Sequence, residues 1–573
     1  MGTRGMGRAK TIAYHPPSIH AMKPEFRVPN TARPDAPPPR RMLWFCRRDV
    51  MALIAGLLAC GVLLVNAAVR PGSRLDELKA PRRYWEDVSV GVSAYFYSGD
   101  QKDVPTIHVG IPIAMDYRHH YEGYLIRMVD ELGIKPWQFW RTVPIRPSLK
   151  KDRIVPRDVD DPGRPALLAA AFRMAGAALP YLGLWLGILF ACPVLLWMAW
   201  ELWRADLPIA GTVLPLLIAS SAFMVDILTL AYSAQAFYGL GALLLLVVSV
   251  HAGLNRSPHY ASLALRLLVA GCVFALSVLG RVSTMALLPA FLLAIALRVD
   301  VLVASTSCRV SRRVWAVALA IAVFMTPYAM VRQSRHHAVW GDIWEGLGDF
   351  DREYGHVWSD SVLRNVLRRE GMQLGPDVGV EFENDQSEQI LRRLVLGAIE
   401  RDPVWYAGIL ARRAVATVTQ RKLWPYFLWD GEAVAPASHP NEGRTDVYYS
   451  MATSVDTLAL GRFRLEIPVG LMIAPTLILV LLRLFSARAG LPPPLRARLN
   501  GYLGSMLLLA LGTASLPVFI TTASAFEVQC FALVYFAGFA FLAEEVQRHF
   551  QFVWKGGAAV VSGSSLPPMP AGG

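Results

Sequence analysis

Long blocks of hydrophobic residues recur along the chain and alternate with polar stretches. Each block has roughly the 17–25 residues that a helix needs to cross a hydrocarbon core of about 30 Å. A soluble core does not require such blocks at repeated intervals, so the pattern predicts an all-α polytopic membrane protein with about ten transmembrane helices. The predicted spans are Met51–Val69, Ala177–Trp200, Leu207–Leu230, Tyr238–His251, Leu263–Leu279, Met285–Leu297, Val314–Val331, Ile467–Leu484, Tyr502–Ile520 and Val528–Leu542.

The polar stretches divide the chain into segments. Residues 1–48 are rich in Pro and Arg and are predicted to be a disordered basic cytosolic tail. The first span (49–69) is interpreted as an uncleaved anchor rather than a signal peptide, because a long basic leader precedes it. Two large loops of mixed or helical structure, 70–165 and 332–462, are predicted outside the cytosol. The bundle of spans two to seven (166–331), the last three spans (463–545) and a cytosolic tail (546–573) complete the order.

Composition and charge agree with this organisation. Hydrophobic residues make up 54% of the chain and charged residues only 18%, against about a quarter in soluble domains. The net charge is +13, but ten Lys or Arg lie within residues 1–48 and others lie in short loops on the same predicted side. This is the positive-inside pattern, which predicts cytosolic termini and argues against nucleic acid as a partner.

Cysteines and motifs exclude several classes of chemistry. Neither large loop contains a cysteine, so no disulfide framework or zinc site is predicted. Adjacent His119 and His120 would point about 100° apart on a helix, and no metal ligands are assigned. The sequence has no P-loop, dinucleotide fingerprint or serine elbow. A reaction outside the cell must then draw its energy from the substrate, as a lipid-phosphate leaving group allows.

Two acidic pairs follow the first span. Asp76 and Glu77 form one pair, and Glu86 and Asp87 form the other. Near a membrane surface a carboxylate can act as general base towards a sugar hydroxyl, or hold a divalent cation against a phosphate. Whether a cation is needed stays open. Arg82 and Arg83 lie between the pairs, and their guanidinium groups match phosphate geometry.

The stretch after Asp87, VSVGVSAYFYSG, sharpens the pattern. It resembles the first external loop of GT-C superfamily glycosyltransferases, such as protein O-mannosyltransferases and aminoarabinose transferases. The matched residues are Glu86, Asp87, Ala94 and Gly99, within about thirty residues. The resemblance implies that Asp87 or Glu86 is the catalytic carboxylate and that the donor is a sugar on a polyprenyl phosphate. The family's acidic pair usually lies nearer the membrane, which keeps Asp76–Glu77 as a rival assignment.

The second loop opens with aromatic residues that alternate with acids. Flat aromatic faces and carboxylates suit carbohydrate recognition, although aromatic residues beside a span also form interfacial belts. Gly346, Gly348 and Gly355 would permit turns that aim these side chains. The predicted substrate-binding residues here are Arg332, His336, His337, Trp340, Asp342, Trp344, Asp349, Asp351 and Asp360, in addition to Arg82 and Arg83.

Other charged residues receive structural interpretations. Residues 387–422 are predicted to form two amphipathic helices with a break at Pro403. Their arginines are expected along anionic headgroups, with binding of a lipid diphosphate as the alternative: Arg392, Arg393, Arg412, Arg413 and Arg421. Within the spans, Arg266 is expected to snorkel to the internal surface, and Asp226 is expected to line a cavity or to pair with Arg281.

The leading hypothesis is an inverting GT-C-type glycosyltransferase in a bacterial cytoplasmic membrane. It would move a sugar from a polyprenyl-phosphate carrier to an envelope acceptor, with the lipid bilayer and the lipid-linked sugar as its partners. An O-antigen polymerase or ligase type of enzyme is the second reading. A non-enzymatic transporter or assembly protein is the third. The sequence names neither the sugar nor the acceptor nor the oligomeric state.

Overall fold

A computed structural model describes most of the hydrophobic blocks and part of the second loop. The described residues are 41–69, 109–112, 154–157, 179–229, 233–254, 260–303, 339–349, 354–356, 360–373, 385–420, 455–486, 490, 492–521 and 525–562. Contacts between residues divide the chain into Met1–Cys46 and Arg47–Gly573. Apart from the first six residues of α1, Arg41–Cys46, the helices and strands described in the next paragraphs belong to the second unit.

The apolar helices confirm the predicted membrane character at a coarse level. Among the described residues, five helical stretches are long and apolar enough to cross a membrane, and four further apolar helices are shorter. The ten-span count stays a prediction, because its seventh span, 314–331, lies outside the described residues. The described helices of the bundle are α1 (Arg41–Val69), α8 (Leu179–Arg204), α9 (Pro208–Ser220), α10 (Ala222–Thr229), α11 (Ser233–Leu254), α12 (Tyr260–Gly280), η3 (Val282–Leu287), α13 (Leu288–Val303), α20 (Val469–Ser486), α21 (Pro493–Phe519), α22 (Ala525–Gln529) and α23 (Ala532–Ser562).

Helix α11 lies at the centre of the bundle. It packs against α8, α12, α13 and α21, and every residue from 236 to 251 is buried. A helix that is hydrophobic on all sides belongs in such a core. The sequence underestimated its length, because polar Ser233 and Gln235 begin a helix that runs over 22 residues.

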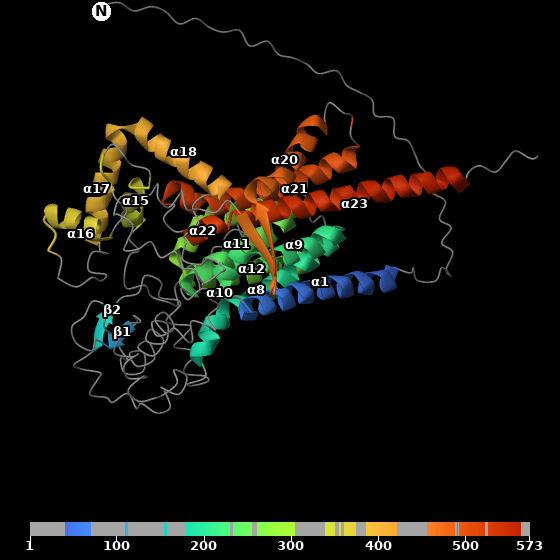
Figure 1. Cartoon of the computed structure of the whole chain (residues 1–573), viewed down its shortest axis with the longest axis horizontal. Coiled ribbons are helices and arrows are strands. Elements are labelled where there is room, and N and C mark those ends of the chain that lie inside the picture. The colour runs from blue at the N-terminus through green and yellow to red at the C-terminus, as the bar shows by residue number, and fades with distance from the viewer. Residues whose placement is uncertain are drawn as a thin grey trace, which may run out of the picture. The chain divides into compact units, whose positions relative to one another are not determined.

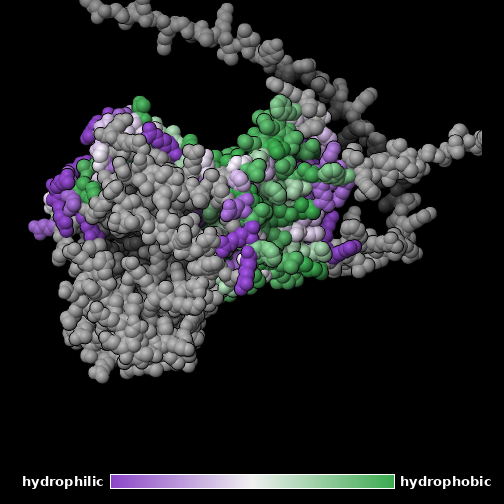
Figure 2. Space-filling view, in the orientation of Figure 1, coloured by the Kyte–Doolittle hydropathy of each residue, from purple (hydrophilic) through white to green (hydrophobic). Residues whose placement is uncertain are grey.

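The outer faces of several helices expose large apolar side chains. More than half of the surface is exposed for each of Leu57 and Leu58 on α1 and Leu477 and Leu484 on α20. Figure 2 shows hydrophobic residues gathered in a band over the helices, with hydrophilic residues on both sides of the band. Water-soluble proteins rarely expose a contiguous apolar patch of this kind, so the band marks the lipid-facing surface.

A β-hairpin joins the second loop to the bundle. Strand β3 (Val455–Leu460) pairs antiparallel with β4 (Phe463–Pro468), and Gly461 in the turn has a φ of +59°. The Asn66 side chain of α1 donates to the carbonyl oxygens of Ala219 and Ala459 at 2.9 and 2.8 Å and accepts the Gly461 N–H. The hairpin is therefore fixed against α1 and α9. In the first loop, β1 (Val109–Pro112) pairs antiparallel with β2 (Ile154–Arg157) as a second two-stranded sheet.

The predicted span Leu207–Leu230 is divided into two helices. Helix α9 ends at Ser220 and α10 begins at Ala222, while Ser221 forms an isolated β-bridge with Leu458 of the hairpin. Hairpin pairing at this point competes with continued helical hydrogen bonding, which hydropathy alone does not reveal.

The second loop contains a helical subdomain, defined here as α15 (Val339–Leu347), α16 (Asp360–Arg369), α17 (Asp385–Arg401) and α18 (Pro403–Thr419). Its core contains Trp344, Leu347, Leu363, Leu367, Met372, Leu391 and Val395. The predicted break is confirmed, since Asp402 caps α18 by accepting the Trp405 N–H and Pro403 takes an early helical position. Figure 1 shows α18 running from α17 towards α21 and α22.

The bundle has two ends with different contacts. Arg48 of α1, Arg204 at the end of α8 and Arg498 near the start of α21 lie at one end of the bundle, which is called the basic end. Helix α18 packs against α21 near the opposite terminus of that helix, which is called the subdomain end. Helix α1 reaches eight residues into the predicted disordered tail, and α23 continues to Ser562, inside the predicted cytosolic tail.

Candidate functional site

Only part of the predicted site lies within the described residues. All four candidate catalytic carboxylates, Asp76, Glu77, Glu86 and Asp87, lie outside it, as do Arg82, Arg83, Arg332, His336, His337 and Asp351. Asp360 begins α16, but its side chain is not among those described. Trp340, Asp342, Trp344 and Asp349 are described, and they all lie in α15 or directly after it.

The two tryptophans of α15 belong to the interior of the helical subdomain. Trp344 is 4% exposed and its ring meets the His356 ring edge-on, with 5.8 Å between the centroids. Trp340 is half-buried against the same core, and the Arg392 guanidinium lies 5.9 Å above its ring. Asp342 is exposed in the first turn of α15, where the helix dipole favours a carboxylate. Trp344 thus packs the subdomain in this structure rather than presenting its face to solvent.

Asp349 forms a buried ion pair that fixes the helical subdomain to the bundle. Its Oδ2 atom lies 3.1 Å from Nε of Arg413, and both side chains are 0% exposed. The Thr521 hydroxyl also donates to this oxygen at 3.3 Å. The Arg413 guanidinium donates to the carbonyl oxygens of Val518 at 3.2 Å and of Gly346. The pair therefore joins α15, α18 and the end of α21.

This arrangement corrects the expectation for Arg413. The side chain does not lie along headgroups, because it neutralises Asp349 inside the subdomain contact. A signal was present in the sequence, since Ile409, Arg413 and Ala416 share one face of α18 and all three are buried. The absence of a side chain at Gly346 is also needed for the contact between the helical subdomain and the bundle. A Cβ there would overlap the Ile520 carbonyl oxygen and lie 2.6 Å from Nη2 of Arg413.

Aromatic side chains and a carboxylate meet at the surface of the helical subdomain. Tyr354 is 41% exposed, and its ring meets the Trp405 ring edge-on at 5.0 Å. His356 stacks on the same indole at 5.6 Å. Gly355, between them, has a φ of +73°, which lets both flanking rings turn towards Trp405. The sequence anticipated the aiming role of Gly355 but not Trp405, which the chain places fifty residues later.

Asp402 completes this surface, which we call the aromatic surface (Tyr354, His356, Asp402 and Trp405). The Trp405 N–H and the Tyr354 hydroxyl donate to its two carboxylate oxygens at 2.9 Å each. These bonds, the backbone N–H first, hold the pKa of the Asp402 carboxyl below its usual range. The carboxylate stays ionised at neutral pH beside aromatic faces, a combination that suits sugar hydroxyls and C–H groups.

Arg281 pairs with an acid that the sequence did not single out. Its Nη2 atom lies 3.4 Å from Oε1 of Glu527, which is 1% exposed, and the Ser283 hydroxyl donates to the same oxygen. The predicted partner, Asp226, is in α10, but its side chain is outside the described set. The Arg281–Glu527 contact joins η3 to α22.

A second buried charged group lies inside the bundle near the basic end. Glu201 of α8 is 1% exposed and accepts from Nε1 of Trp197 at 2.9 Å. Nη1 of Arg266 lies 2.6 Å from Oε1, and Nδ1 of His251 lies 3.1 Å from Oε2. Arg266 was predicted to snorkel to the internal membrane surface. Its guanidinium instead neutralises the buried Glu201 carboxylate on α8. The sequence missed Glu201 because the hydropathy of its span ended at Trp200.

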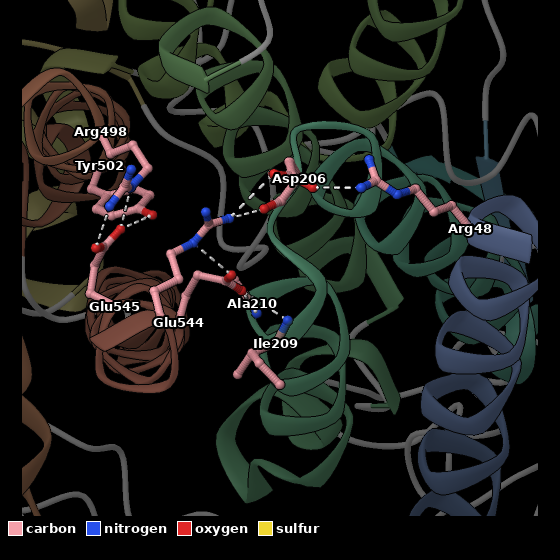
Figure 3. Close-up of polar contacts among 9 residues, drawn as sticks. Arg48, Asp206, Ile209, Ala210, Arg498, Tyr502, Glu544 and Glu545 are labelled. Carbon is pink, nitrogen blue, oxygen red and sulfur yellow. Dashed lines mark hydrogen bonds and ion pairs between the residues drawn. The ribbon is translucent and has the colours of Figure 1, made fainter. Parts of the chain in front are cut away.

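The basic end is tied together by a polar network (Figure 3). Asp206 makes the turn after α8 with a φ of +65°, and its carboxylate lies 2.9 Å from Arg48 and 3.8 Å from Arg548. Glu544 of α23 accepts the N–H groups of Ile209 and Ala210 at 2.8 and 3.1 Å, and so caps α9 from another helix. The same figure shows Glu545 with Arg498 and Tyr502, whose contacts measure 2.6 to 2.8 Å.

Across the described ranges, no group of three or more His, Cys, Asp or Glu side chains could hold a metal ion. The described cysteines Cys60, Cys192, Cys272 and Cys530 are free thiols. No family model matches the chain, and neither a curated protein nor a solved structure matches it.

Proposed function

We propose that the protein is a membrane-embedded glycosyltransferase. It would take a sugar from a polyprenyl-phosphate donor and pass it to a cell-envelope acceptor at the subdomain end of the bundle. The observation that carries the proposal is the aromatic surface, where an ionised carboxylate lies beside the exposed Tyr354 ring and the half-buried Trp405 ring, on a subdomain that is fixed to a membrane bundle. Such a surface suits a saccharide held close to the lipid.

The distribution of charge supports the orientation. Arg48, Arg204 and Arg498 lie at the same end of the bundle, although they come from distant parts of the chain. Short segments rich in arginine favour the cytosolic face, which would place the helical subdomain outside the cytosol of a bacterial cell. Nucleotide-sugars are cytosolic, so a lipid-linked donor is the activated sugar that this face can reach.

The proposed chemistry is an inverting displacement. The acceptor hydroxyl oxygen attacks the anomeric carbon from the face opposite the phosphate, and the bond between that carbon and the phosphate oxygen breaks. Asp87 or Glu86 takes the hydroxyl proton, with Asp76 and Glu77 as the rival pair. The polyprenyl phosphate leaves with its charge balanced by Arg82, Arg83 or Arg332.

The test uses the full-length protein in nanodiscs with a polyprenyl-phosphate donor that carries a radiolabelled sugar. Transfer of label to an envelope-lipid acceptor is expected from the wild type. Glu86→Gln or Asp87→Asn should lower the rate by about 10²–10⁴, the usual contribution of a general base. Asp385→Asn, an exposed acid on α17, is the matched control and should retain the rate. Full activity of both the Glu86 and the Asp87 variants would rule out this pair.

One observation favours a transporter as the second candidate. The divided helix pair α9–α10 with its bridge at Ser221, and the buried Glu201–Arg266 pair, are features of helices that line a solute path. A transporter would move a solute into proteoliposomes without transferring any labelled sugar. Glu201→Gln would then stop uptake, whereas it would leave a glycosyltransferase reaction at the other end of the bundle largely intact.

A further inference from the structure

A groove lies between α9 and the β3–β4 hairpin, separate from the aromatic surface. Its volume is about 390 Å³, within the range of roughly 300–1,000 Å³ typical of small-ligand pockets. One wall is a single face of α9, formed by Val213, Leu216, Leu217 and Ser220 at helical spacing. The other wall is the hairpin. The lining is apolar except for Ser220 and Arg464.

The contacts of Asn66 place the groove in depth. Asn66 follows Arg48 by 18 residues on α1, a distance of about 27 Å along the helix axis. This is close to the thickness of a hydrocarbon core, about 30 Å. Since Arg48 lies at the basic end, the hairpin turn beside Asn66 lies near the opposite membrane surface. The α9 wall extends from there about 10 Å inwards, because Val213 precedes Ser220 by seven residues.

The hairpin residues beside the groove are exposed and apolar at this depth. Phe463 is 81% exposed, Leu465 61% and Leu460 55%. Val65, on the neighbouring turn of α1, is 46% exposed. Side chains of this kind are favourable where acyl chains cover them and unfavourable in water. The rim also carries Arg464, whose guanidinium suits a phosphate at the level of the headgroups.

We propose that this groove binds one acyl chain of a phospholipid from the leaflet at the subdomain end, with the lipid phosphate at Arg464. The chain would run along the α9 face from Ser220 towards Val213, beneath Phe463 and Leu465. The bound lipid would fill the space between α9 and the hairpin and hold the hairpin against the bundle. This role does not depend on the proposed glycosyl transfer.

The test is native mass spectrometry of the full-length protein in detergent. The protein is supplied with equal amounts of phosphatidylglycerol, a diacylglycerol with the same chains, and a polyprenyl phosphate. The wild type is expected to retain one phosphatidylglycerol. Leu217→Trp fills the groove and should lower this retention by about tenfold. Leu477→Trp, at a lipid-exposed position of α20 outside the groove, is the matched control and should retain the lipid.

The phosphate contact has its own variant. Arg464→Gln should remove the preference for phosphatidylglycerol over diacylglycerol, whereas Arg369→Gln on α16 should keep it. Equal retention by the Leu217 and Leu477 variants would overturn the proposal, as would retention of polyprenyl phosphate in place of phosphatidylglycerol. Ser220→Phe blocks the same groove and replaces Leu217→Trp if that variant melts well below the wild type.

Discussion

The buried ion pair between Arg413 and Asp349 gives the sharpest prediction of stability. Arg413→Met keeps most of the side-chain volume and removes the positive charge that faces Asp349. Because both side chains are fully buried, removing one partner should cost about 3–5 kcal/mol of the free energy that holds the subdomain to the bundle. The lost hydrogen bonds to the Val518 and Gly346 carbonyl oxygens fall within the same estimate.

Hydrogen–deuterium exchange of the full-length protein in nanodiscs measures this effect locally. Exchange should quicken in α15 and α18, whereas the central helix α11 should remain protected. Arg412→Met, one residue away on the exposed face of α18, is the matched control and should change stability by less than about 0.5 kcal/mol. The double variant Arg413→Met with Asp349→Leu should recover part of the loss, because no buried charge then remains at the contact. Equal exchange in the Arg412 and Arg413 variants would refute this reasoning.

Three further predictions concern other contacts. Gly346→Ala should destabilise subdomain docking by about 1–3 kcal/mol through overlap with α21, whereas Gly397→Ala, with open space around it, should stabilise α17; equal melting temperatures would contradict this. Glu544→Gln should cost about 1–3 kcal/mol by weakening the cap on α9, seen as faster amide exchange in its first turn, and unchanged exchange would exclude the cap. The pKa of Asp402 is lowered in the folded protein, so its carboxylate stabilises the start of α18 above the pKa of the unfolded chain, and this stabilisation is lost as the pH falls through the pKa of the folded protein. Amide exchange at the start of α18 should therefore rise only below about pH 4, and Asp402→Ala should abolish that rise.

Hydropathy predicted the positions of most helices because lipid-facing and buried helices share one requirement, a long apolar block. It did not predict that the block Leu207–Leu230 divides at Ser221, since the division depends on pairing with a hairpin that comes more than two hundred residues later. The break at Pro403 was predictable, because Asp402 and Pro403 form a local cap signal.

The candidate site was predictable only in composition. The residues of the second loop indicated aromatic and acidic chemistry, but not which side chains pack inside. Trp344 is buried because its face of α15 packs on the subdomain core, and Asp349, directly after α15, is buried because it pairs with Arg413. Trp405 belongs to the aromatic surface because its ring packs against Tyr354, a tertiary contact that no local sequence pattern predicts.

The most direct test asks whether the basic end and the subdomain end of the bundle lie on opposite sides of the membrane. Val404, 80% exposed on the helical subdomain, and Gln551, exposed on α23 beyond the basic end, are each replaced by cysteine in a chain whose native cysteines are serine. A membrane-impermeant maleimide is then applied to sealed right-side-out and inside-out vesicles. Val404→Cys should react only in right-side-out vesicles and Gln551→Cys only in inside-out vesicles. Reaction of both cysteines from the same side would contradict the claim that the helical subdomain and the basic end lie on opposite sides of the membrane.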